Sequence, residues 1–228
     1  MKKKRFEMDD GFRPELVAGA SFDGILEIPV IHKPNEILIP RNIVPFSQFN
    51  SVGGSGYAVS FNDMDLAFSD AIRSPENYLS PFSRFDAIIS PDVSLYRDQP
   101  LTTQIANIYR NRAIGYYYQS KGLYVIPQIR WGDERTYTTM VLPEKAAFLG
   151  APKRSIVYVS TYGCIQGKEN KMYFRNGLQA MLEELEPVVV LVYGPMPDSV
   201  FGDYLSYTKF VQYPDWISQK RGRINDGN

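Results

Sequence analysis

The stretch SIVYVSTYGCIQGKENKMYFRNGLQAMLEELEPVVVLVYGP, residues 155–195, decides the fold. It begins with the apolar run Ser155–Val159 and ends with the β-branched run Val188–Val192, and such runs are typical of strands buried on both faces. Between them, apolar residues recur at helical spacing over Lys168–Glu186, and Pro187 ends that helix. Strand, helix and strand in this order predict a parallel pair joined by a right-handed crossover.

The same order of elements extends towards the N-terminus. Phe85–Ile89 and Leu123–Ile129 are predicted strands, and the segment between Pro100 and Gly122 has helical spacing. Weaker signals predict a strand at Tyr57–Phe61, a helix at Asp65–Arg73 and a strand at Lys209–Tyr213. We therefore expect an α/β fold of mainly parallel strands alternating with helices, either barrel-like or an open sheet. Polar residues follow several successive strands, which favours an incomplete barrel.

The N-terminal region differs from the rest of the chain. Short β-like pieces at Gly24–Ile31 and Glu36–Ile39 are separated by prolines, a pattern that favours extended structure over helix. We expect residues 1–56 to form a Pro-rich arm or hairpin packed on an α/β domain at 57–215, followed by a polar tail at 216–228.

Composition excludes several classes of function. The 25 basic and 25 acidic residues cancel, so no global field draws the chain to nucleic acid or an anionic membrane. No apolar run reaches the roughly 20 residues of a membrane-spanning helix, and no signal peptide follows Lys2–Arg5, which predicts a cytoplasmic protein. Cys164 and His32 are the only residues of their types, which excludes intrachain disulfides and cysteine-based or paired-histidine metal sites.

Candidate site residues follow three of the predicted strands. In parallel α/β folds, ligands bind beyond the carboxyl ends of the strands, where loops present side chains on a rigid frame. Arginines there can grip a phosphate or carboxylate, aromatic planes can stack a ring, and hydroxyls can contact an anion. The candidates are Asp92, Tyr96 and Arg97 after the first of these strands, Arg130, Trp131, Asp133 and Arg135 after the second, and Ser160 and Thr161 after the third.

Most of these residues also have a purely structural interpretation. Asp92 can cap a turn, and Asp98 is placed to cap the helix that begins near Pro100. Asp133 can be the N-cap of a short helix, and Arg130 can simply pair with Asp92. From the sequence, an ion-pair network and a ligand site look alike. Cys164, without a histidine nearby in the chain, is expected to be a buried or loop thiol.

Several short motifs resemble one family in their combined order. They are Ser90-Pro91-Asp92, Tyr96-Arg97-Asp98, Arg110-x-Arg112 with Gly115, Gln119-Ser120-Lys121-Gly122, Trp131-Gly132-Asp133 and Ser160-Thr161-x-Gly163-Cys164. Over about 82–194 the chain resembles the family named domain of unknown function 4417. The resemblance implies a bacterial protein of the kind often carried by phages and mobile elements. Tyr162 stands where relatives are expected to have histidine, which argues against a histidine-dependent mechanism at that loop.

The first functional hypothesis is a phage or mobile-element accessory protein that binds a small molecule. The ligand would be anionic or nucleotide-like. Arg97, Arg130 and Arg135 would hold its charge, and Trp131 or Tyr96 would stack on its ring.

Two alternatives stay open. A hydrolase of phosphoester or glycosidic bonds would use Asp92 and Asp133 as an acid/base pair or as ligands for Mg²⁺, although the sequence itself identifies no cofactor. A module binding a host or phage protein, or nucleic acid, would use the basic runs Lys2–Arg5 and Lys220–Arg223.

Overall fold

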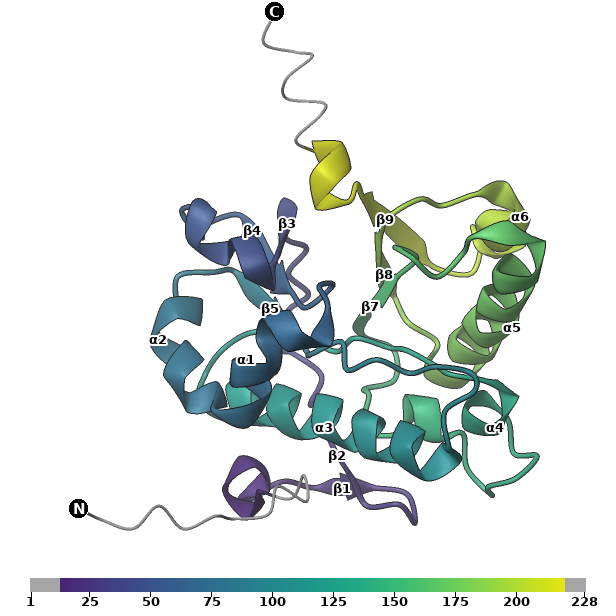
Figure 1. Cartoon of the computed structure of the whole chain (residues 1–228), viewed down its shortest axis with the longest axis horizontal. Helices are drawn as coiled ribbons and strands as arrows, with labels where there is room; N and C mark the ends of the chain where they lie inside the picture. Colours follow the sequence, from purple (N-terminus) through teal and green to yellow (C-terminus); the bar gives the residue numbers. More distant parts are fainter. Residues whose placement is uncertain (1–12, 220–228) are drawn as a thin grey trace, which may run out of the picture.

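The computed structural model describes residues 13–219 as strands that alternate with helices (Figure 1). Two parallel sheets form beside a small antiparallel hairpin, and their strand orders are β3-β4-β5-β6 and β7-β8-β9. This confirms the predicted fold class. The strands are β3 (Asn42–Pro45), β4 (Tyr57–Ser60), β5 (Ala87–Ile89), β6 (Val125–Ile126), β7 (Ile156–Ser160), β8 (Val189–Tyr193) and β9 (Lys209–Tyr213).

The two sheets meet just after β6. A parallel bridge pairs Gln128 with Tyr158 of β7, and the Ile129 amide donates to the Tyr158 carbonyl at 2.8 Å. The strands thus follow one another in chain order, as in a (β/α) barrel. Within residues 13–219 no ladder joins β9 back to β3, so the sheet is open, although the Tyr213 hydroxyl donates to the Pro40 carbonyl at 2.5 Å.

Two long helices cover the sheets, and their bounds lie close to the prediction. They are α3 (Leu101–Ser120) and α5 (Gly167–Leu185), and α5 ends where Glu186 takes a left-handed conformation before Pro187. The shorter helices are α1 (Ser69–Arg73), α2 (Leu79–Phe82), α4 (Glu134–Tyr137) and α6 (Asp198–Phe201), with 3-10 turns at Pro14–Val17, Phe46–Ser51, Asp65–Phe68, Pro75–Tyr78, Ala146–Phe148 and Gly202–Tyr204. The predicted cap by Asp98 is wrong, because Pro100 occupies the N-cap of α3 and no side chain bonds to that end.

Apolar side chains fill both sides of the sheets. One core packs α5 and α6 against β7 and β8, and a second, rich in phenylalanine, packs α1, α2 and α3 against β3 to β6. A third lies on the opposite face and takes residues from β3 to β9, which include Ile43, Ile89 and Leu191. Burial on both faces explains why the strands read as unbroken apolar runs.

The N-terminal arm contributes to both the hairpin and the sheet. Strands β1 (Phe22–Asp23) and β2 (Ile28–Pro29) form an antiparallel hairpin, and β2 packs against α3 (Figure 1). Strand β3 also lies within residues 1–56, so the parallel sheet begins inside the segment assigned to the arm. The basic runs Lys2–Arg5 and Lys220–Arg223 and most of the predicted tail lie outside the described residues. None of the helices within residues 13–219 has the length and apolar character that a membrane span requires.

The Arg112 side chain of α3 holds the backbone that follows β6. This side chain is 2% exposed, and its guanidinium donates to the carbonyls of Leu149, Gln128 and Ala147 at 2.9, 2.8 and 3.1 Å. Burial lowers the pKa of Arg112 to about 10, which leaves the group protonated at neutral pH. A buried cation that satisfies three carbonyls therefore holds the backbone at the end of β6 in place.

Candidate ligand-binding site

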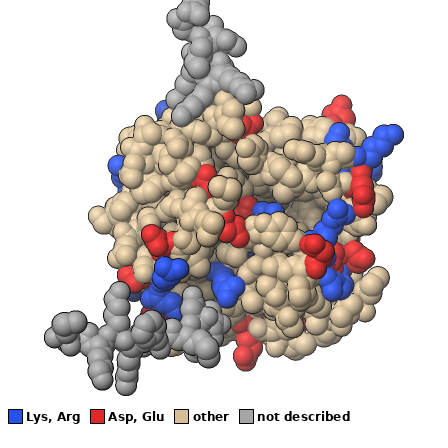
Figure 2. Space-filling view, viewed as in Figure 1, with Lys and Arg blue, Asp and Glu red and all other residues tan. Residues whose placement is uncertain are grey.

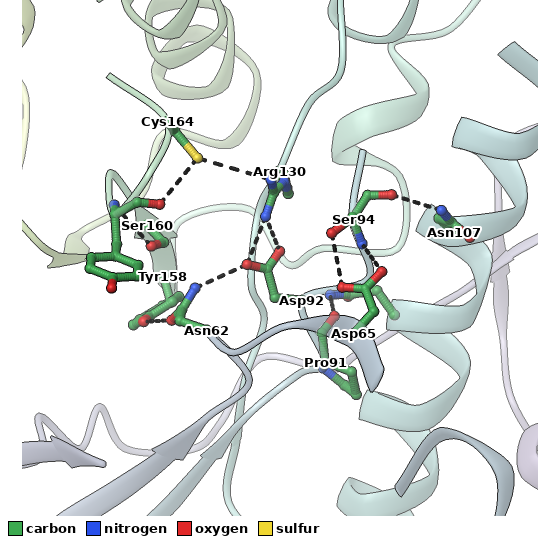
Figure 3. A network of polar contacts seen from close by, with 12 residues as sticks. Asn62, Asp65, Pro91, Asp92, Ser94, Asn107, Arg130, Tyr158, Ser160 and Cys164 are labelled. Carbon is green, nitrogen blue, oxygen red and sulfur yellow. Dashed lines mark hydrogen bonds and ion pairs between the residues drawn. The ribbon is translucent and has the colours of Figure 1, made fainter. Parts of the chain in front are cut away.

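A chain of polar contacts crosses the carboxyl ends of β4, β5, β6 and β7 (Figure 3). The Tyr158 hydroxyl donates to the Asn62 amide oxygen, and the Asn62 nitrogen donates to Asp92 at 2.9 Å. One terminal nitrogen of Arg130 donates to both Asp92 oxygens at 2.8 Å, and the other lies 4.0 Å from the Cys164 sulfur. Because parallel strands end at the same edge, residues 30 to 96 positions apart in sequence meet here.

The Asp92–Arg130 ion pair is the centre of this network. The Asp92 side chain is 6% exposed and that of Arg130 is 26% exposed, so water screens the pair weakly. Burial is the largest single influence and would lower the pKa of Arg130, but the neighbouring groups, with the Asp92 carboxylate foremost, together outweigh it and the pKa is raised. Arg130 is thus a permanent cation, and the structural interpretation in which it pairs with Asp92 is confirmed.

The groups at the two ends of the network are neutral at physiological pH. Burial raises the pKa of the Tyr158 phenol well above its ordinary value, so the phenol keeps the proton that it donates to Asn62. Burial also raises the pKa of the Cys164 thiol, and the nearby Arg130 offsets only part of that rise. Cys164 is therefore a protonated, partly buried thiol, as the sequence predicts, rather than a reactive thiolate.

A pocket of about 240 Å³ lies beside this network, and we call it the strand-end pocket. Two arginines, Arg97 and Arg130, line it, and no carboxylate does. Four aromatic side chains also contribute to the lining. The remaining lining is mixed, and the full set is Leu95, Tyr96, Arg97, Gln128, Ile129, Arg130, Trp131, Gly132, Ser160, Gly163, Cys164, Asn170, Tyr173 and Phe174.

The two cations differ in how firmly they are held. Arg97 stacks over the Tyr173 ring with 4.1 Å between the guanidinium carbon and the ring centroid, and it pairs with Glu169 at 3.5 Å. Its side chain is 41% exposed, so this ion pair is weak. Arg97 also donates to the Asn170 amide oxygen at 3.0 Å, so exposed contacts hold it at the pocket mouth, whereas Asp92 holds Arg130 in the interior.

Trp131 forms a fixed wall of the strand-end pocket. Its ring packs on Phe174 with 5.0 Å between centroids, and its exposed fraction is 9%. The indole also fills the space over Gly177 of α5, where an added Cβ would lie 2.2 Å from the Trp131 nitrogen. Gly177 thus allows the indole to approach the helix backbone. Tyr96, by contrast, is 59% exposed at the rim.

Asp133 and Arg135 lie in a neighbouring, more open pocket with Asp98 and Glu169. Asp133 is the N-cap of α4 and accepts from the Arg135 amide at 3.0 Å, which confirms its structural interpretation. Hydrogen bonds from the Arg135 side chain at 2.8 and 2.7 Å lower the pKa of Asp133. Asp92 and Asp133 are thus each held by a different arginine, and their joint role in catalysis stays a prediction. Within residues 13–219, histidine, cysteine and acidic side chains form no group of three suited to a metal.

The two hydroxyls after β7 have different surroundings. Ser160 lines the strand-end pocket, and its oxygen accepts from the Tyr162 amide at 3.3 Å. Thr161 is 1% exposed and donates to the carbonyls of Tyr193 and Pro195 at 3.2 and 2.8 Å. Thr161 therefore ties the end of β7 to the end of β8 and does not line this pocket.

Sequence reasoning missed several residues of the site. Asn62 follows β4 directly and bridges Tyr158 to Asp92, a position that the rule of strand carboxyl ends would have included. Gln128 is a polar residue near the end of a predicted apolar strand, and this interruption of the apolar run could have marked it as a site residue. Tyr173 and Phe174 come from α5, where helical spacing alone marks them as core residues.

The fold and the site define an open, parallel α/β protein with charged and aromatic groups gathered at the carboxyl ends of its strands. The chain matches the family described as Domain of unknown function (DUF4417) over residues 20–214, and it belongs to that family. This confirms the resemblance seen in the sequence. No solved structure matches the chain.

Two similar proteins come from mycobacteriophages. The Gene 1 protein of Mycobacterium phage D29 is 31% identical over 172 residues, which cover 75% of this chain and 60% of the phage protein. The Gene 1 protein of Mycobacterium phage L5 is 30% identical over 167 residues, which cover 73% of this chain and 69% of the phage protein. The chain is therefore phage-associated by its relatives, and it spans about three fifths of the length of the D29 protein.

Proposed function

We propose that this chain is a phage or mobile-element accessory protein that binds a small anionic ligand with a flat ring in the strand-end pocket. The observation that carries the proposal is the lining, with two arginines, four aromatic rings and no carboxylate. Arginine recognises phosphate and carboxylate groups through directed hydrogen bonds, and aromatic side chains provide apolar area for a ring.

The size of the pocket supports a small ligand. Its volume of about 240 Å³ lies below the roughly 300–1,000 Å³ of typical small-molecule sites. Basic and acidic side chains are interspersed on the face shown in Figure 2, and no broad area of one sign appears there. That face offers little to a long polyanion, so a compact ligand from the cytoplasm fits the proposal better than a nucleic acid.

Binding is tested by calorimetry and thermal shift with nucleoside monophosphates, sugar phosphates and inorganic phosphate. We expect at least one organic phosphate to raise the melting temperature, because a ligand selective for the folded state stabilises it. Arg97→Ala should weaken that binding about tenfold or more, since a charge-assisted hydrogen bond contributes about 1.5–3 kcal/mol.

Arg175→Ala provides a matched control. Arg175 pairs with Asp203 and lies over the Tyr204 ring at 5.7 Å, and its side chain is 42% exposed. It thus shares with Arg97 an ion pair, a ring contact and a similar exposure, but it does not line the strand-end pocket. If Arg97→Ala and Arg175→Ala bind the ligand equally well, or if no anion binds the intact protein, the proposal is wrong.

A further inference from the structure

The Gln128 side chain is a buried polar group with an unmet hydrogen-bonding requirement in the strand-end pocket. Its amide oxygen, Oε1, is buried and finds no donor among the described residues, although Gln128 is only 2% exposed. A buried acceptor without a partner costs about 1–3 kcal/mol, so such groups are rare unless a ligand or water completes them.

Three contacts fix the backbone at Gln128. The Gln128 amide donates to the Ser90 hydroxyl at 2.8 Å, and its carbonyl accepts from Arg112 at 2.8 Å. The parallel bridge to Tyr158 fixes the same residue from the β7 side. These three contacts fix the Gln128 backbone at the strand end, and the residue is only 2% exposed, so its side chain is packed among the residues that line the pocket.

The neighbours of Gln128 indicate which donor would satisfy it. Ile129, Trp131 and Phe174 line the same pocket and are each less than 10% exposed. Sugar hydroxyls placed among these side chains would lose water without a partner, which is costly. A flat heterocycle instead stacks on the aromatic rings and presents its N–H groups in its own plane.

We propose that Gln128 reads the hydrogen-bonding edge of a nucleobase, so that the ligand class of the strand-end pocket is a nucleoside monophosphate rather than a sugar phosphate. This inference rests on the proposed function, because the arginines must hold the phosphate. An amide places an acceptor beside two donors, and glutamine uses this pair to recognise base edges in nucleic acids. The ring would lie against Trp131 with its edge at Gln128.

The test compares AMP, GMP, CMP and UMP with ribose 5-phosphate and inorganic phosphate, by calorimetry on the full chain. At least one nucleotide should bind about tenfold or more tightly than ribose 5-phosphate. Gln128→Leu should remove this excess affinity for the nucleotide, and any change in the affinity for ribose 5-phosphate should be smaller than that loss. It should also raise the melting temperature of the free protein, because leucine needs no hydrogen bond.

Ser155→Ala is the matched control. The Ser155 hydroxyl is also buried without a partner, but it lies at the opposite end of β7, outside the strand-end pocket, so this variant should leave nucleotide affinity unchanged. If ribose 5-phosphate binds as tightly as every nucleotide, or if Gln128→Leu still binds a nucleotide more tightly than ribose 5-phosphate, recognition of the base by Gln128 is wrong. The proposed anion-binding function would not be contradicted by either result. If none of the six compounds binds, the proposed function fails as well.

Discussion

Breaking the Asp92–Arg130 pair should show whether the strand ends depend on it. Asp92→Asn keeps the shape of the side chain but leaves the Arg130 charge without its counter-ion. Removing one partner of a buried pair costs about 3–5 kcal/mol, and the 26% exposure of Arg130 places the expected loss near about 3 kcal/mol. Arg130→Met should cost a similar amount, because it leaves Asp92 uncompensated.

The double variant measures the interaction energy between the Asp92 and Arg130 side chains. If the two single losses arise from the same interaction, Asp92→Asn with Arg130→Met should cost about 4 rather than about 6 kcal/mol, a coupling of about 2 kcal/mol. Urea unfolding followed by circular dichroism gives the four free energies, provided that the denaturant dependence stays the same. The exposed pair Arg154–Glu186, joined at 2.8 Å, should show a coupling below about 1 kcal/mol as Arg154→Met with Glu186→Gln. Additive losses for Asp92 and Arg130, within about 0.5 kcal/mol, would refute the reasoning.

Three further predictions follow from single side chains. Arg112→Met removes the donor from the carbonyls of Gln128, Ala147 and Leu149 and should lower the free energy of unfolding, measured in urea, by about 4 kcal/mol. The hydrogen bonds that lower the pKa of Asp133 stabilise the folded state above its ordinary pKa, and this contribution disappears as the pH falls. Asp133→Asn should therefore flatten the loss of stability between about pH 5 and pH 2, as measured by urea unfolding at each pH. Gly177→Ala should destabilise by about 1–3 kcal/mol because it displaces Trp131, while Asn176→Ala on the exposed face of α5 should be neutral or stabilising by thermal unfolding.

The sequence predicts the regular part of the fold well, for a physical reason. Val188–Val192 is an unbroken apolar run, which is typical of a strand buried on both faces. Lys168–Glu186 has apolar residues at helical spacing, which is typical of a helix with one buried face. Asp98 failed as a cap because capping needs a precise backbone geometry at Pro100 that composition does not encode.

Strand β3 shows a second limit of local reasoning. Asn42–Pro45 lies among prolines, which suit an extended arm, yet it pairs in parallel with Tyr57–Ser60. Proline lacks a backbone donor, and β3 tolerates it as the first strand of its sheet, with a partner on one side only. Propensity alone does not distinguish a free extended segment from an edge strand, because the pairing is a long-range contact.

The candidate site was predictable in position but not in the roles of its residues. The rule of strand carboxyl ends places Asp92, Arg130 and Ser160 near one another, and the structure does the same (Figure 3). Whether the Gln128 oxygen is satisfied depends on the packing of β6, β7 and α5 together. No pattern within a single segment encodes that outcome.

These roles change how variants of the site must be interpreted. Asp92 faces Arg130 and Asn62 and does not line the strand-end pocket. Under the proposed function, Asp92→Ala would therefore weaken ligand binding only indirectly, through a loosened Arg130 and a less stable fold. A ligand lost in that variant would not locate the binding site. Arg97 and Gln128 are better probes, because one side chain is half exposed and the other is unpaired, and neither removes a counter-ion from the interior. The ligand is therefore best sought with variants whose own folding cost is small.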